Sequence, residues 1–511
     1  MTKTIAGTNP HTGQPLPVVS AVTSEVEVAA TVDAAAKAGE WLASLPRRDR
    51  AALLRTISKG LEGQRESLIA AAMQETGLGE ARLGGELTRA VYQLEFFAGV
   101  IEEGSYLEAT LDPAGDTPMG HRPDLRRMLV PTGVVAVFGA SNFPFAFSVA
   151  GGDTASALAA GSAVVVKAHS SHPLTSKLSH EAMATAATDF GAPAGLLGIV
   201  YGQRAGVELV IHPEVTAVGF TGSLGGGQAL IDAIATRQEP IPFYGELSSI
   251  NPVIVTAQAA TERAQQIGEG LAASVTGSAG QLCTKPGVVF LPAGPAGDAV
   301  LESLTKGMAE AAVPPLLNRR IFESYADITA GWEKPEAATG DGVTTEYKAS
   351  PTSASGFFVS PAIYSVNAPD VQPHLIQEVF GPSSLVTRYA SQDQLSTALA
   401  HVEKSLTATI QHGNNDPDLE PLTALLLPRC GRILFNGYPT GVAVSWAQNH
   451  GGPWPATNSL HTSVGATAIR RFLRPVTWQN APQEVLPEEL RDGYAEIPRR
   501  VDGTLTIPAS A

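Results

Sequence analysis

The chain of 511 residues is 44% hydrophobic and 16% charged, a composition that excludes an intrinsically disordered protein. Its 34 Lys and Arg face 49 Asp and Glu, and the formal charge of −15 disfavours binding to nucleic acid or to an anionic membrane. Two cysteines cannot build a disulfide framework or a cysteine-rich zinc site, so we expect a reducing, cytoplasmic compartment and no metal.

Helical patterns dominate the first part of the chain. Ser24 and Glu27 have the spacing of a capping box, which predicts a helix that continues to about Gly39. Proline and glycine alternate with charged residues over 111–127, which favours a loop or a hairpin. Further helices are predicted over 50–62, 66–75 and 86–103.

From residue 129 onward, strand and helix patterns alternate with short connections, which predicts a parallel, doubly wound α/β sheet. Residues 128–152 carry no charge but contain proline and glycine, so we interpret them as buried strand and turn rather than a membrane helix. A second strand–helix series covers 252–444. The expected strands are 134–138, 163–167, 197–201 and 217–220, and the expected helices are 147–160, 174–190, 205–211 and 228–236.

A glycine-rich turn follows one of these strands, in the segment Ala217-Val-Gly-Phe-Thr-Gly-Ser-Leu-Gly-Gly-Gly227. Backbone N–H groups at the start of the next helix suit a pyrophosphate. The spacing is not G-x-G-x-x-G, however, and a tight strand-to-helix turn explains the segment equally well. The sequence has no P-loop, no nucleophile elbow and no HExxH motif.

The two cysteines differ in their surroundings. Cys283 stands among small residues and precedes a lysine, in Gly277-Ser-Ala-Gly-Gln-Leu-Cys-Thr-Lys-Pro286, which suits an accessible, reactive thiol. A buried structural cysteine is the alternative for any cysteine. Cys430 fits that alternative better, because it precedes the apolar stretch 432–435.

Two polar residues stand out among apolar neighbours. Glu246 lies between Pro242 and Pro252 and is either a base with a raised pKa or a solvated loop residue. Asn142 follows the uncharged strand, where its amide can donate to an oxyanion or simply serve a turn.

Taken together, these segments resemble the aldehyde dehydrogenase superfamily over nearly the whole chain. The resemblance implies that Cys283 is the nucleophile, that Glu246 is the general base, and that Asn142 stabilises an oxyanion beside the Cys283 backbone N–H. It also implies NAD(P)-dependent oxidation of an aldehyde to a carboxylic acid through a thiohemiacetal and a thioester. The motifs that carry it are, in order, Asn142, Lys167, Gly222-Ser223, Glu246, Cys283 and Glu378-Val-Phe-Gly-Pro382.

The same resemblance assigns the cofactor-binding residues. Lys167, Gly222 and Ser223 are expected at the ribose and phosphate, and Glu378 and Phe380 at the nicotinamide end.

The cofactor is expected to be NADP in preference to NAD. Where NAD-preferring relatives have Lys-Pro-Ser-Glu, this chain has Lys167-Ala-His-Ser170, and a neutral Ser170 does not repel a 2′-phosphate. Arg204 in the next strand-to-helix turn can grip that phosphate, or is only an exposed loop arginine.

Further motifs look like a bacterial, NADP-linked branch that includes 2,5-dioxovalerate (α-ketoglutaric semialdehyde) dehydrogenases and long-chain fatty aldehyde dehydrogenases. In that branch His450 assists as a second base, the alternative being a loop histidine bonded to backbone. The motifs are Glu246-Leu-Ser-Ser-Ile250, Gln281-Leu-Cys-Thr-Lys-Pro-Gly287, Phe435-Asn-Gly-Tyr-Pro-Thr-Gly441 and His450-Gly-Gly-Pro453.

The substrate is expected to be 2,5-dioxovalerate, with long-chain or other apolar aldehydes as the alternative. No arginine or Ser/Thr cluster for a substrate carboxylate can be placed from the sequence. A catalytically silent relative and a CoA-acylating enzyme are rival interpretations, and the intact Cys283, Glu246 and Asn142 set argues against the first. Aromatic residues expected to line an apolar tunnel are Phe143, Phe145, Tyr438 and Trp454.

The family fold implies two Rossmann-like domains and a small β oligomerisation arm, and therefore a homodimer or homotetramer. The expected parts are a cofactor-binding domain over 1–107 and 132–247, a catalytic domain over 248–465, and an oligomerisation segment over 108–131 and 466–511.

Overall fold

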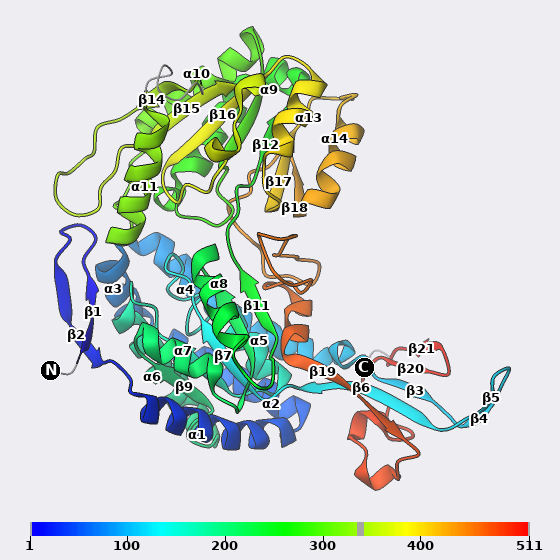
Figure 1. The fold of residues 1–511 in the computed structure, drawn as a ribbon. Helices are drawn as coiled ribbons and strands as arrows, with labels where there is room; N and C mark the ends of the chain where they lie inside the picture. Colours follow the sequence, from blue (N-terminus) through cyan, green and yellow to red (C-terminus); the bar gives the residue numbers. More distant parts are fainter. Residues whose placement is uncertain (1–2, 335–341, 509–511) are drawn as a thin grey trace.

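The computed structural model describes residues 3–334 and 342–508, and two largely parallel sheets with flanking helices form most of it (Figure 1). The first sheet has five strands in the order β11-β10-β7-β8-β9, all parallel. Such a sheet is the doubly wound arrangement that the alternating pattern predicts, so the expected fold class is confirmed. Its strands are β7 (Val134–Phe138), β8 (Val164–Lys167), β9 (Leu197–Val200), β10 (Val215–Thr221) and β11 (Phe243–Glu246).

The strands of this sheet are almost wholly buried, which explains their uninterrupted Val-rich sequences. The capping box at Ser24 is present and opens α1 (Glu25–Ser44), which is longer than predicted. The flanking helices are α1, α5 (Gly152–Ala160), α6 (Pro173–Phe190), α7 (Gln203–Ile211) and α8 (Leu224–Ile234), together with α2 (Arg47–Glu62), α3 (Arg65–Thr76) and α4 (Glu80–Glu103).

The second sheet has seven strands in the order β14-β15-β16-β13-β12-β17-β18. It is parallel except at one edge, where β14 runs antiparallel to β15. The loop that carries Cys283 leads into the strand Val288–Pro292 of this sheet. Its strands are β12 (Val253–Val255), β13 (Val288–Pro292), β14 (Thr344–Lys348), β15 (Ala362–Asn367), β16 (Ser383–Tyr389), β17 (Ser405–Gln411) and β18 (Cys430–Phe435).

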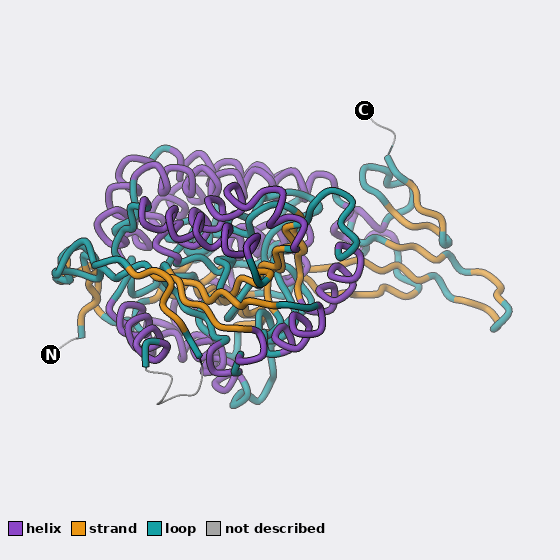
Figure 2. Tube along the Cα trace, turned by 90° about the horizontal axis from the view of Figure 1, so that it is seen from above, coloured by secondary structure: helices purple, strands orange, loops and turns teal. Residues whose placement is uncertain are grey.

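A third sheet joins two segments far apart in sequence and extends beyond the body of the molecule (Figure 2). In it β6 (Leu125–Pro131) pairs antiparallel with β19 (Leu473–Gln479). The strand order is β19-β6-β3-β20-β21, where β3 is Thr110–Asp112, β20 is Arg499–Val501 and β21 is Thr504–Thr506.

Three local predictions differ from the structure. Before α1 the chain forms a hairpin of β1 (Thr4–Thr8) and β2 (Pro15–Ala21), which the polar, half-exposed sequence did not reveal. The helix predicted over 147–160 begins only at Gly152, because 143–151 form a loop. Helix α4 begins at Glu80, ahead of the predicted residue 86, and its Glu86 carboxylate accepts hydrogen bonds from the N–H groups of Phe145 and Ala146 in that loop.

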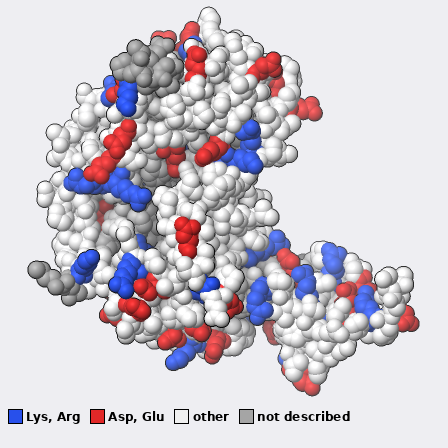
Figure 3. Space-filling model, in the orientation of Figure 1, with Lys and Arg blue, Asp and Glu red and all other residues white. Residues whose placement is uncertain are grey.

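On the face drawn in Figure 3, acidic and basic side chains are interspersed over broad uncharged areas. Among the described residues, no helix combines the length and the apolar character needed to cross a membrane.

Candidate active site

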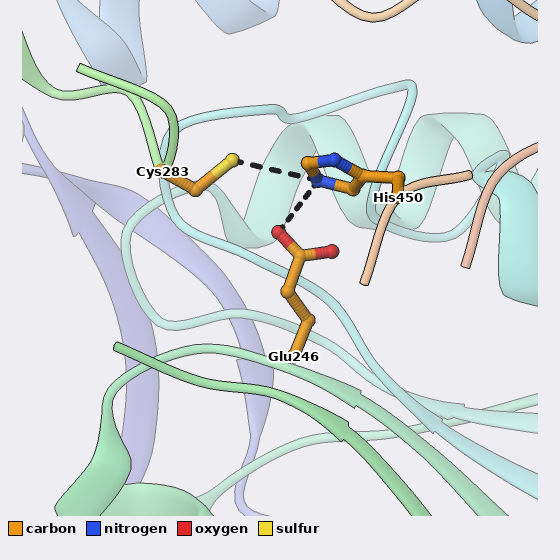
Figure 4. Close-up of side chains that lie close together, drawn as sticks. All are labelled: Glu246, Cys283 and His450. Carbon is orange, nitrogen blue, oxygen red and sulfur yellow. Dashed lines mark hydrogen bonds and ion pairs between the residues drawn. The ribbon is translucent and has the colours of Figure 1, made fainter. Parts of the chain in front are cut away.

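Three side chains from distant parts of the chain meet at the junction of the two parallel sheets: Cys283, Glu246 and His450 (Figure 4). The Cys283 Sγ lies 3.7 Å from His450 Nε2, and Glu246 Oε1 lies 2.9 Å from the same nitrogen. A single ring nitrogen thus faces both a thiol and a carboxylate. With a hydrogen on Nε2 it donates to Glu246, and without one it accepts from the thiol.

Glu246 is placed by the end of β11, where the carboxyl ends of parallel strands present ligand-facing residues. Its backbone carbonyl accepts from Gly222 N at 3.0 Å, which joins it to the glycine-rich turn. Its second carboxylate oxygen, Oε2, lies 3.0 Å from the hydroxyl of Ser463. Both oxygens of this fully buried carboxylate therefore have partners, and the solvated-loop interpretation does not describe it.

The pKa of Glu246 reflects opposing effects. Burial raises it, but the charge and hydrogen bond of His450, with hydrogen bonds from Cys283 and Ser463, bring the pKa below its ordinary value. The group is consequently an anion at neutral pH, which is the form a general base requires.

Cys283 follows a tight loop in which the chain adopts left-handed conformations. Ser278 and Ala279 have φ angles of 51° and 55° in the 3-10 turn Gly277–Gly280. A Cβ on Gly280 would lie 2.1 Å from the carbonyl oxygen of Gly381, so only glycine allows this close packing against the Glu378-to-Pro382 motif.

Asn251, which sequence analysis missed, fixes the chain on the other side of the thiol. Its Nδ2 donates to the carbonyl oxygens of Cys283 and Lys285 at 2.8 and 3.0 Å. The one available signal was its position before a proline at the end of the Glu246 segment. Lys285, expected to favour the thiolate, instead donates to the carbonyl of Ser383.

Burial, reinforced by the negative charge of Glu246 and its hydrogen bond, raises the pKa of the Cys283 thiol well above its ordinary range. The thiol of the ligand-free chain is therefore protonated at neutral pH. Its proton has an acceptor at hand in the His450–Glu246 pair.

His450 is held so that its ring faces the thiol and the carboxylate. Its backbone N–H donates to Thr462 Oγ1 at 2.8 Å, and its ring packs against Phe147 with a centroid distance of 6.0 Å. The partners of His450 Nε2 are therefore side chains. The alternative interpretation, a loop histidine whose ring is bonded to backbone, does not describe it.

Asn142 lies within the same site and is buried. Its Nδ2 donates to the Gln281 carbonyl at 2.8 Å, which aligns the amide with the chain leading to Cys283. The second hydrogen on Nδ2 has no further partner among the described residues, so a donor remains for an oxyanion.

Three of the residues expected at the cofactor, Lys167, Gly222 and Ser223, lie at the carboxyl ends of strands of the first sheet. Ser223 caps α8, and its Oγ accepts from Gly226 N at 3.3 Å, so the helix start with Gly222 is preformed for a phosphate. Lys167 at the end of β8 is half-buried, burial lowers its pKa, and it has no ion-pair partner among residues 3–334 and 342–508. A half-buried ammonium without an anion fits a ligand with ribose hydroxyls or phosphate.

Ser170 and Arg204 are both exposed. Arg204 is the second residue of α7 and has a 78% exposed side chain that pairs with Glu208 at 3.3 Å and Glu25 at 3.6 Å. Any phosphate that Arg204 binds must therefore compete with these carboxylates.

Glu378 and Phe380 lie in the loop that precedes β16. The Ser248 hydroxyl donates to Glu378 Oε2 at 2.9 Å, and burial raises the pKa of Glu378 to about 7. Ser248 belongs to the Glu246-Leu-Ser-Ser-Ile250 segment, so this motif has a direct contact with Glu378.

The four aromatic residues expected in an apolar tunnel are not gathered in one place. Phe143 packs edge-on against Phe147 at 5.2 Å and so stands beside His450. Phe145 is fully buried. Tyr438 donates to backbone carbonyls of α9 (Ala257–Thr276), and Trp454, 52% exposed, lines a surface groove with Lys404 and Arg429.

Phe147 was missed because its segment was interpreted as helix. Its place in the loop before α5 puts it between Phe143 and the His450 ring.

The ligand atoms of Glu246, Cys283 and His450 all lie within 4.8 Å of one another, a donor set that a divalent metal ion could also use. The expectation that the protein needs no metal stays a prediction.

Comparisons with known proteins identify the family to which the chain belongs. The profile of the aldehyde dehydrogenase family matches residues 1–472. The chain is 42% identical to alpha-ketoglutaric semialdehyde dehydrogenase 2 of Azospirillum brasilense, over 98% of this chain and 96% of that protein. It is 41% identical to an alpha-ketoglutaric semialdehyde dehydrogenase of Acinetobacter baylyi, over 90% and 88%.

Among solved structures, an E. coli NADP dependent enzyme superposes with a TM-score of 0.79 at 25% identity, covering 93% of this chain and 94% of that one. These matches confirm the resemblance inferred from the ordered motifs. The chain belongs to the aldehyde dehydrogenase family, and it is an NAD(P)-dependent aldehyde dehydrogenase.

Proposed function

We propose that this enzyme oxidises 2,5-dioxovalerate to 2-oxoglutarate with NADP, using Cys283 as its nucleophile. The observation that carries the catalytic assignment is the contact of one His450 nitrogen with both the Cys283 thiol and the Glu246 carboxylate. The substrate is supported by two relatives at 42% and 41% identity, both named alpha-ketoglutaric semialdehyde dehydrogenases and each matched over most of both chains.

In the first step, the thiol proton passes to the His450–Glu246 pair and Cys283 Sγ adds to the aldehyde carbon. Asn142 Nδ2 and the Cys283 backbone N–H donate to the oxygen as it becomes negative. One donor of this kind is worth about 3 kcal/mol in the transition state. When bound, the nicotinamide cofactor supplies the hydride acceptor that turns the thiohemiacetal on Cys283 into a thioester.

In the second step, Glu246 removes a proton from a water molecule that attacks the thioester carbon. The lowered pKa of Glu246 keeps its carboxylate ionised. Because Ser463 is bonded to Oε2, the other oxygen, Oε1, is the one that releases His450 and accepts the proton of the water. The proton that the pair took from the thiol leaves to solvent before this step, so that Glu246 is again a carboxylate. His450 then serves as the second base: it holds the proton released by the water and returns it to the Cys283 sulfur as the carbon–sulfur bond breaks and the carboxylic acid leaves.

For the cofactor, we propose that Gly222 and Ser223 at the start of α8 bind the pyrophosphate and that Lys167 binds a ribose. Glu378, held by Ser248, and Phe380 would position the nicotinamide end. Ser170 and Arg204 would accommodate the 2′-phosphate of NADP, with Arg204 leaving its two carboxylate partners.

Oxidation of apolar aldehydes is the second candidate. Phe143 and Phe147, packed together beside His450, favour it because they offer an apolar surface next to the thiol.

Product analysis with and without CoA separates hydrolysis of the thioester from its transfer to CoA, and the buried Glu246 base favours hydrolysis.

We also propose that residues 1–107 with 132–247 bind the cofactor, that 248–465 form the catalytic domain, and that 108–131 with 466–511 mediate a cytoplasmic homodimer or homotetramer. Strand β19 supports an oligomer because it is an edge strand of the third sheet and, within the part of the chain that the structure describes, pairs only with β6. Light scattering of the purified protein measures the assembly.

The test of the substrate is a panel of kcat/KM values for purified enzyme with 2,5-dioxovalerate and with neutral aldehydes of increasing length, each with NADP and NAD. The highest value is expected for 2,5-dioxovalerate with NADP. A higher value for long, neutral aldehydes would replace the first candidate with the second.

A further inference from the structure

Helix α4 places four polar side chains along the face that meets the loop 142–147. Three of them hold this loop in place. Arg82 donates to the carbonyl of Asn142, Glu86 accepts from the N–H groups of the loop, and Gln93 donates to the carbonyl of Ala146. The fourth, Arg89, lies between Glu86 and Gln93 in sequence.

Arg89 makes no comparable hydrogen bonds. Its Nε and Nη2 atoms are buried and have no hydrogen-bond partner among the described residues. Arg82, by contrast, uses its guanidinium on Glu86, Ser278 and Asn142. A buried donor without a partner costs about 1–3 kcal/mol, so an arginine retained in this state is more easily explained by a ligand than by packing.

The surroundings of Arg89 place it at the active site. Its guanidinium lies over the ring of Phe147, with the Cζ atom 5.0 Å from the ring centroid, and that ring contacts His450. Burial lowers the pKa of Arg89, and Glu86, Cys283 and Glu246 lie near enough for their charges to oppose that lowering. The free guanidinium and the nucleophile therefore share one region of the site.

We propose that Arg89 binds the carboxylate at the far end of an aldehyde substrate while Cys283 attacks the aldehyde carbon. A guanidinium presents a planar pair of N–H donors that match the two oxygens of a carboxylate. The stacking on Phe147 orients this plane. The substrate class is then short aldehydes that end in a carboxylate, and 2,5-dioxovalerate is one of them.

This inference rests on the proposed function, and it adds the residue that sequence analysis could not place. The aromatic pair Phe143 and Phe147 has a corresponding role: each ring lies under an arginine, Phe143 under Arg82 and Phe147 under Arg89. The rings then support cations that border the site instead of lining a tunnel for an alkyl chain.

The test compares Arg89→Met with wild type on two substrates of similar length, 2,5-dioxovalerate and pentanal. Hydrogen bonds to a charged group contribute about 1.5–3 kcal/mol, which corresponds to roughly 10- to 150-fold in affinity. We expect kcat/KM for 2,5-dioxovalerate to fall by roughly that factor, mainly through KM, while pentanal oxidation changes by less than about threefold. Arg48→Met, at an exposed arginine remote in sequence from the motifs, is the matched control and should leave both values unchanged.

Equal losses on both substrates would overturn the proposal, because Arg89 would then act on Cys283 or on the loop. No loss on either substrate would overturn it as well. A wild-type enzyme that prefers pentanal to 2,5-dioxovalerate would refute the proposed function itself, an outcome visible before any variant is made.

Arg89→Lys keeps the charge and provides a second variant in case the methionine variant does not fold. Its readout is inhibition of pentanal oxidation by 2-oxoglutarate, the carboxylate-bearing product. A weaker inhibition in Arg89→Lys than in wild type is expected, and unchanged inhibition would contradict bidentate binding at this residue.

Discussion

Glu246 Oε1 and His450 Nε2 are 2.9 Å apart in a pair whose side chains are both almost fully buried. On one side of the pair, the Ser463 hydroxyl is hydrogen-bonded to Glu246 Oε2, and on the other side His450 Nε2 faces the Cys283 thiol. A proton leaving the thiol thus reaches a carboxylate through one imidazole nitrogen, without water from the bulk. This relation links the two chemical steps, since the same pair takes the thiol proton and later activates water.

The pH dependence of turnover tests this pairing. Burial raises the pKa of Glu246 and His450 is foremost among the groups that lower it, so His450→Gln should raise that pKa. Because the base works as the carboxylate, the acid limb of the kcat–pH profile should move to higher pH in the variant. His401→Gln, on an exposed histidine, is the control. Superimposable profiles for wild type and His450→Gln would show that His450 does not influence the base.

Asn142→Ala tests stabilisation of the oxyanion. The loss of one donor should lower kcat by roughly 10²- to 10³-fold with a small change in KM. Thermal unfolding of the variant serves as the control, because Asn142 also binds the Gln281 carbonyl. If kcat falls by less than about tenfold in a variant with the wild-type Tm, the Cys283 backbone N–H and not Asn142 is the principal donor to the oxyanion.

Cofactor choice is tested at Arg204 and its partner Glu25. Arg204→Met should reduce the NADP-to-NAD ratio of kcat/KM by roughly 10-fold or more, since the charged hydrogen bonds to the 2′-phosphate are lost. Glu25→Gln should raise the ratio, because it removes a carboxylate 3.6 Å from the guanidinium. An unchanged ratio in both variants would exclude Arg204 from cofactor recognition.

Metal dependence is tested with chelator and with zinc. The proposed chemistry needs no metal, so EDTA should leave activity unchanged. Added Zn²⁺ should inhibit reversibly by binding Cys283, His450 and Glu246, whose ligand atoms lie within 4.8 Å of one another. His450→Gln should be less sensitive to zinc. Loss of activity with EDTA would contradict the metal-free mechanism.

The sequence predicts those parts of the molecule that depend on local pattern. Buried Val-rich strands alternating with helices predict the parallel sheet around β7, and the capping box at Ser24 opens α1 as expected. The ordered motifs predict the family, and the structure brings Cys283, Glu246 and Asn142 into one site.

Such local patterns do not predict contacts between distant segments. His450 and Glu246 are separated by 204 positions, and nothing local to either indicates the other. Arg89 looks like an ordinary helical arginine until the loop before α5 places Phe147 beneath it. Residues 147–151 of that loop were predicted as helix, because the Glu86 carboxylate that accepts hydrogen bonds from the loop lies on another helix.

The covalent intermediate provides the most direct measurement of the central claim. Glu246→Gln should form the thioester with 2,5-dioxovalerate and NADP but hydrolyse it slowly, because His450 still accepts the thiol proton in the variant while hydrolysis needs Glu246 to activate a water. Rapid mixing should show a burst of NADPH without turnover, and peptide mass spectrometry should locate the acyl group on Cys283. Cys283→Ala should show neither, and Cys430→Ala should show wild-type turnover with at most reduced stability. An acyl group on Cys430, or a burst that persists in Cys283→Ala, would contradict the account.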